Sequence, residues 1–110
     1  MWLACRVLGS VVTVPLVEEL AFRGYLTRRL IRPDYWSLPV GAFSWASFLI
    51  SSALFGMMHS RWIEGTLSGM VFALVLYRRR NLFDAVVAHA TANGLIAAYV
   101  LSSGDWSLWA

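Results

Sequence analysis

The sequence contains no lysine, a single cysteine and few charged residues of any kind. Of its 110 residues, 14% are charged and 59% are hydrophobic, whereas soluble globular chains are about 25% charged and about 45–50% apolar. Such a composition excludes intrinsic disorder, and it makes a water-soluble monomer difficult to build because a small domain cannot bury most of its side chains. The lone Cys5 excludes a disulfide framework and a multi-cysteine zinc site.

All the basic residues are arginines, and they give a formal net charge of +3. Most of them stand in short clusters between apolar runs, which is typical of membrane-protein loops rather than of a nucleic-acid-binding surface. No nucleic-acid partner is therefore expected. If the apolar segments alternate in direction, one side receives six arginines and the other receives Arg6 and Arg61; the six are Arg28, Arg29, Arg32, Arg78, Arg79 and Arg80. The six-arginine side is expected to be cytoplasmic.

Four apolar segments follow one another along the chain. They run from about Trp2 to Arg32, from Gly41 to His59, from Trp62 to Tyr77 and from Leu82 to about Leu101. Because a bilayer core of about 30 Å needs about 20 helical residues, and because none of the segments alternates strictly, we expect helices rather than strands. The sequence predicts an all-α polytopic membrane protein, a bundle of about four transmembrane helices in a single domain. The buried helices of a soluble bundle are the alternative.

Two local features refine this prediction. The first segment is expected to form one long helix, kinked at Pro15 and ended by Pro33. The third contains Gly65 and Gly69 in a G-x-x-x-G arrangement, which allows two helix backbones to approach closely.

Two adjacent carboxylates interrupt the first segment after eleven uncharged residues, 7–17. Within lipid, each would cost several kcal/mol unless it met a partner or water. Glu19 precedes Arg23 by four residues, the order and spacing that permit an ion pair on one helix face. Glu18 is rotated by about 100° and points elsewhere. Alternatively, both glutamates mark a helix end at the membrane interface.

Both histidines of the chain stand in pairs at the same helical spacing. His59 follows Phe55 by four residues, and His89 precedes Asn93 by four. Each pair taken alone is compatible with a structural role, but convergence with the glutamates inside the bundle would satisfy all these polar groups. A glutamate with two histidines supports either activation of water by a general base or a metal site.

The three motifs together resemble the signatures of the CPBP group of intramembrane proteases. The sequence reads E-E-x-x-x-R at Glu18, Glu19 and Arg23, F-x-x-x-H at Phe55 and His59, and H-x-x-x-N at His89 and Asn93. The group includes CAAX prenyl endopeptidases of the Rce type, bacteriocin-processing proteins and Abi proteins. The resemblance covers about residues 14–95. The segment VPLVEELAFRGYL and the C-terminal Trp106-x-x-Trp109 also resemble sequences of a bacterial branch of the group that is associated with exosortase and PEP-CTERM sorting systems.

The resemblance implies a role for each matching residue. Glu18 would be the base that activates water, assisted by His59, while His89 and Asn93 would stabilise the oxyanion on the scissile carbonyl. Glu19 and Arg23 would position the site, with Phe55 in support. Family members carry further membrane helices before the first motif, so residues 1–110 are expected to be either the catalytic core of a longer protein or a truncated form of the family domain.

The implied substrate is a protein or peptide, and the implied location is a membrane, the inner membrane of a bacterium. Proteins of a sorting or bacteriocin system are the partners that the resemblance suggests. No cofactor is expected. Two alternatives remain: a metal-dependent version of the same protease, with zinc held by Glu18, His59 and His89, and a non-catalytic membrane scaffold in which the polar groups only tie helices together.

Overall fold

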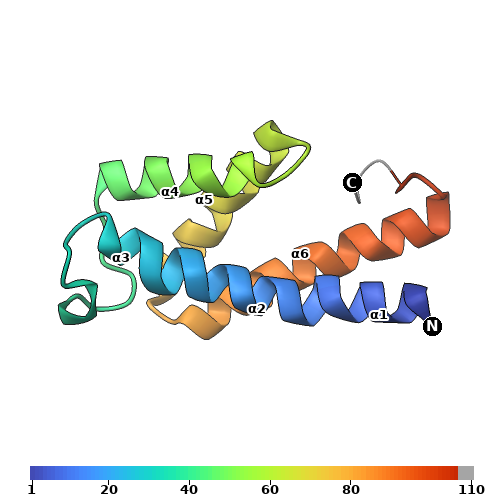
Figure 1. Ribbon diagram of the computed structural model, residues 1–110, viewed down its shortest axis with the longest axis horizontal. Helices are drawn as coiled ribbons and strands as arrows, with labels where there is room; N and C mark the ends of the chain where they lie inside the picture. Colours follow the sequence, from blue (N-terminus) through green and yellow to red (C-terminus); the bar gives the residue numbers. More distant parts are fainter. Residues whose placement is uncertain (107–110) are drawn as a thin grey trace.

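The computed structural model describes residues 1–106, and within that range the regular structure is entirely helical (Figure 1). The all-α prediction is confirmed. A long N-terminal helix is followed by a 3-10 turn, η3 (Tyr35–Ser37), and by three helices, α4 (Trp45–Met57), α5 (Trp62–Arg79) and α6 (Leu82–Ser103). Trp109, the second tryptophan of the W-x-x-W ending, lies outside the described residues.

The N-terminal helix is continuous from Trp2 to Arg29, and its α-helical winding is interrupted twice by a π-helical turn. Its parts are α1 (Trp2–Leu8), η1 (Gly9–Thr13), α2 (Val14–Glu19), η2 (Leu20–Leu26) and α3 (Thr27–Arg29). Both η1 and η2 are π-helical: the N–H of Val14 donates to the carbonyl of Gly9, and that of Thr27 donates to the carbonyl of Phe22. Each bond spans five residues, as a π turn requires.

The first π turn ends two residues before the proline where a kink was expected. Pro15 has no N–H, so the carbonyl of Val11 cannot receive its usual bond from four residues further on. The wider turn of η1 shifts the bonding by one residue at this point. The irregularity therefore takes the form of a π turn, and the helix continues through it.

Helix α4 is shorter than the apolar segment that predicts it. Ser44 caps its start by accepting a hydrogen bond from the N–H of Ser47 at 3.0 Å, and its 13 residues end at Met57. The expectation that the helix extends from Gly41 to His59 is therefore wrong at both ends. His59 lies in the turn between α4 and α5, where its own N–H bonds to the carbonyl of Gly56.

Helices α4 and α5 meet with almost no side chain between their backbones. A Cβ atom placed on Gly56 would lie 2.7 Å from the backbone nitrogen of Thr66 and 2.8 Å from the carbonyl oxygen of Trp62. On the α5 side, a Cβ on Gly69 would lie 2.9 Å from the ring of Phe55. The close approach predicted from the G-x-x-x-G pair is confirmed.

Gly69→Ala is expected to lower the thermal stability of the protein. The added methyl group would meet Phe55, and α5 cannot simply withdraw because the Gly69 carbonyl accepts a hydrogen bond from Arg23. Overpacking of this kind costs about 1–3 kcal/mol. Thermal unfolding in detergent measures it, with Gly94→Ala as the matched control, since a Cβ on Gly94 has no neighbour within 4 Å. An unchanged melting temperature for Gly69→Ala would refute the expectation.

The N-terminal helix and α6 lie side by side and run in opposite directions, while α5 crosses the bundle obliquely (Figure 1). The arginine clusters gather at one end. There, Arg28 donates to the carbonyl of Leu38 at 3.1 Å, and a Cβ on Gly41 would lie 3.2 Å from the side chain of Arg80. Arg61 lies in the turn between α4 and α5, at the opposite end of these helices.

Only α6, among the described helices, is long and apolar enough by length and composition to cross a membrane. Its 22 residues extend over about 33 Å. Helix α4 is apolar but has only 13 residues. Helix lengths alone thus support one span and do not confirm the expected arrangement of four spans.

Candidate active site

A buried charged cluster joins the first helix to α5 and α6. The Oε2 atom of Glu19 lies 3.3 Å from Nη1 of Arg23 and 2.9 Å from Nδ1 of His89. Arg23 also donates through Nη2 to the carbonyl of Gly69. All three side chains of the cluster are buried. The predicted pairing of Glu19 with Arg23 is confirmed, and the contact with His89, 70 residues away, is an addition that the local spacing did not reveal.

Glu18 lies on the other side of the same imidazole. Its Oε2 atom is 3.9 Å from Nε2 of His89, and 16% of its side chain is exposed. That oxygen is buried and has no hydrogen-bond partner among the described residues. Because 3.9 Å exceeds a hydrogen bond, both atoms remain able to bond to one shared water or substrate atom. His89 thus stands between two carboxylates, one at each ring nitrogen.

Aromatic rings hold His89 in place. Its imidazole stacks on Phe72, with ring centres 4.5 Å apart and an angle of 17° between the planes, and it meets Phe55 edge-on at 5.5 Å. The guanidinium of Arg23 lies over Phe55 at 4.7 Å, within cation–π range. The ring of His89 is therefore fixed by packing on its faces and by Glu19 at one nitrogen.

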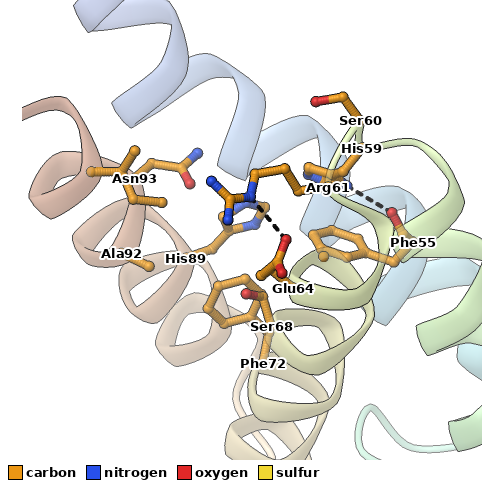
Figure 2. A pocket seen from close by; sticks show the side chains of 12 residues that line it. Phe55, His59, Ser60, Arg61, Glu64, Ser68, Phe72, His89, Ala92 and Asn93 are labelled. Atoms are coloured by element: carbon orange, nitrogen blue, oxygen red, sulfur yellow. Dashed lines mark hydrogen bonds and ion pairs between the residues drawn. The ribbon is translucent and has the colours of Figure 1, made fainter. Parts of the chain in front are cut away.

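Phe55 also connects the two histidines. The ring of His59 lies 4.8 Å from that of Phe55, and its Nδ1 atom is 2.8 Å from the Phe55 carbonyl oxygen (Figure 2). The imidazole approaches α5 closely because Gly65 has no side chain; a Cβ there would lie 3.1 Å from Cβ of His59. His59 is near enough to Glu18 for the two groups to interact electrostatically.

Asn93 links α6 back to the first helix. Its Nδ2 donates to the carbonyl of Ser10 at 2.7 Å, in the π turn η1. The amide carries two N–H donors, so one further donor is available beyond this bond.

Five of these side chains, namely those of Phe55, His59, Phe72, His89 and Asn93, border a cavity of about 170 Å³. Its polar and aromatic lining comes from α4, from the turn that follows it and from α5 and α6, and includes Phe55, His59, Arg61, Glu64, Phe72, His89 and Asn93 (Figure 2). Glu18 does not line the cavity, although its carboxylate approaches the ring of His89, which does. Sequence reasoning missed Arg61 and Glu64 because their place at the cavity depends on the turn that follows α4.

The residues named for a possible metal site are not arranged as one. Within residues 1–106, no three histidine, cysteine, aspartate or glutamate side chains are placed to share a metal ion. Nδ1 of His89 is bonded to Glu19, and Nδ1 of His59 lies against the carbonyl of Phe55. These contacts leave Nε2 of both imidazoles available, but Glu18, His59 and His89 do not group closely enough in this arrangement to share one metal ion.

Comparison with known proteins identifies the class as membrane-embedded endopeptidases. The family described as type II CAAX prenyl endopeptidase Rce1-like matches residues 1–95. The chain belongs to this Rce1-like family, which confirms the resemblance seen in the sequence. No match is found among curated proteins or among solved structures. The family is embedded in membranes and acts on protein or peptide substrates.

Proposed function

We propose that this protein is a glutamate-type intramembrane endopeptidase that hydrolyses a peptide bond with an activated water molecule. One observation carries the proposal: a buried oxygen of Glu18 without a hydrogen-bond partner among the described residues lies 3.9 Å from Nε2 of His89. A carboxylate with an unused acceptor beside a fixed imidazole is what general-base activation of water needs. The membership of the chain in an endopeptidase family supplies the reaction class.

In the proposed reaction, Glu18 removes a proton from water while the water oxygen attacks the carbonyl carbon of the substrate. The carbonyl oxygen becomes an oxyanion, which His89 and Asn93 stabilise. Glu18 then returns the proton to the leaving nitrogen as the C–N bond breaks, and His59 assists this transfer. General-base catalysis contributes about 10² to 10⁴ in rate, and each oxyanion donor about 10² to 10³.

This assignment places a requirement on the proton positions of His89. Its Nδ1 faces the carboxylate of Glu19 and therefore donates, so a donor at Nε2 as well requires both nitrogens to carry protons. Glu19 is suited to hold that imidazolium by its negative charge. One N–H of the Asn93 amide donates to the carbonyl of Ser10, and the other N–H is the proposed donor to the oxyanion.

We also propose that the four helical segments span the membrane with the arginine-rich end in the cytoplasm of a bacterium. Large apolar side chains face outward on every segment, among them Leu20, Leu54, Leu74 and Leu95. Outward apolar surface on every helix is favourable in contact with lipid. The arginine clusters at one end agree with the positive-inside pattern. Peptides of a sorting or bacteriocin system are candidate substrates.

The direct test is cleavage of synthetic peptides by the purified protein in liposomes, with metal content measured on the same samples. The peptides should include a prenylated C-terminal peptide and its unmodified counterpart. We expect cleavage that survives chelation. Activity lost on chelation and restored by zinc would make Glu18 a ligand instead of a base. A folded protein that cleaves none of these peptides would favour the scaffold interpretation.

A further inference from the structure

The cavity carries a charged pair that the proposed chemistry does not use. Arg61 and Glu64 both line it, and Nε of Arg61 lies 2.9 Å from Oε2 of Glu64. Their side chains are 47% and 60% exposed. Figure 2 shows the guanidinium extending over the cavity, on the side where His89 and Asn93 lie.

Stability alone gives little reason for this pair. An exposed ion pair contributes about 0–1 kcal/mol, and salt screens it further. The hydrogen bond to Glu64 uses Nε of Arg61, while Nη1 and Nη2 carry four more N–H donors. A guanidinium with its terminal nitrogens directed over a cavity is suited to bind a second carboxylate in a bidentate manner.

The composition of the cavity wall favours anion binding at Arg61. Among the lining residues, Arg61 is the only permanent cation and Glu64 the only carboxylate, and much of the remaining wall is formed by Phe55, Phe72 and Ile96. A charge interaction is stronger beside apolar walls than in water. Arg61 also directly precedes the N-terminus of α5, whose backbone dipole favours an anion at the same place.

We propose that Arg61 is a specificity-determining residue that binds a carboxylate of the substrate through Nη1 and Nη2, while Glu64 holds the guanidinium over the cavity through Nε. The inference rests on the proposed function, because it takes the cavity as the place where the peptide binds. The carboxylate is either the free C-terminus of the peptide or an acidic side chain close to the scissile bond. Since the cavity also borders His89 and Asn93, the carboxylate binds within a few residues of the scissile carbonyl.

The test compares three fluorescent peptides derived from one parent sequence. One ends in a free carboxylate, one ends in an amide, and one ends in an amide but carries an aspartate beside the cleavage site. Both Kd and the cleavage constants are measured for the wild type, Arg61→Gln, Arg61→Lys and Glu64→Gln. Arg29→Gln is the matched control, because Arg29 is exposed at the opposite end of the bundle.

We expect the wild type to bind a carboxylate peptide about 10- to 100-fold more tightly than the plain amide, as hydrogen bonds to charged groups allow. Arg61→Gln should remove this preference by raising Kd and KM for the carboxylate peptide, with kcat and the amide peptide little affected. Arg61→Lys should be intermediate because it lacks the bidentate fork. Glu64→Gln should strengthen binding of the carboxylate peptide. Which of the two carboxylate peptides is preferred identifies the source.

Two results would overturn the inference: equal binding of carboxylate and amide peptides by the wild type, or an equal effect of Arg61→Gln on both. The proposed function fails separately. Carboxylate-selective binding that depends on Arg61, without any cleavage, would retain the anion site and reject the protease. Cleavage without carboxylate selectivity would retain the protease and reject the anion site.

Discussion

Glu18→Gln is expected to abolish peptide cleavage while the protein remains folded. Glutamine preserves the size of the side chain and part of its hydrogen bonding, but it cannot accept a proton from water. Because the buried Oε2 atom of Glu18 has no hydrogen-bond partner among the described residues, the change breaks no hydrogen bond of that atom and removes only the negative charge 3.9 Å from Nε2 of His89. A loss of about 10² to 10⁴ in kcat follows from the removal of a general base. Peptide cleavage in liposomes, together with the melting temperature of the same sample, measures both effects.

Asp84→Asn is the matched control for this experiment. Asp84 is a carboxylate on the same helix as His89, but it pairs with Arg79 at 2.9 Å near the arginine-rich end. The control should retain wild-type activity. Full activity of Glu18→Gln would reject the role of Glu18 as the base, and inactivity accompanied by unfolding would show that its carboxylate is structural.

Glu19→Gln is expected to act mainly on stability. The carboxylate of Glu19 contacts both Arg23 and His89 in a buried cluster, so neutralising it leaves the guanidinium without its counter-charge. Breaking a buried ion pair at one partner costs about 3–5 kcal/mol. We expect a lower melting temperature and folded yield, with residual cleavage per folded molecule, whereas Glu18→Gln shows the reverse pattern.

The double variant Glu19→Gln with Arg23→Gln separates charge from packing. If the single losses arise from an uncompensated buried charge, removing both charges should destabilise the protein by less than the sum of the two single changes. Strict additivity would contradict this explanation. Complete loss of turnover in Glu19→Gln at normal folded yield would give Glu19 a direct catalytic role.

Much of the architecture was predictable because its signals are local. Helices α5 and α6 begin where expected, at Trp62 and Leu82, and end two residues beyond the predicted limits. The pairing of Glu19 with Arg23 follows from their spacing on one helix, and the close contact of α4 with α5 follows from glycine. The three motifs indicated the family without any knowledge of the fold.

Other features depend on distant contacts that no local pattern encodes. The F-x-x-x-H spacing suggests that Phe55 and His59 share a helix, yet α4 ends at Met57 and the turn carries His59 over Gly65. The same turn brings Arg61 to the cavity. The position of His89 between the carboxylates of Glu18 and Glu19 could not be predicted either. The two glutamates are adjacent in the sequence, and nothing in the local pattern shows that a histidine 70 residues away lies between them.

The two π turns set how the first helix responds to changes in its length. A π turn accommodates one more residue than an α turn, so a residue lost within Gly9–Thr13 or Leu20–Leu26 can be absorbed by rewinding to α geometry. A residue lost within Val14–Glu19 has no such reserve and would rotate the following side chains by about 100°. The stretch carrying the two glutamates therefore lies between two π turns, each of which can absorb the loss of one residue without changing the direction of the carboxylates.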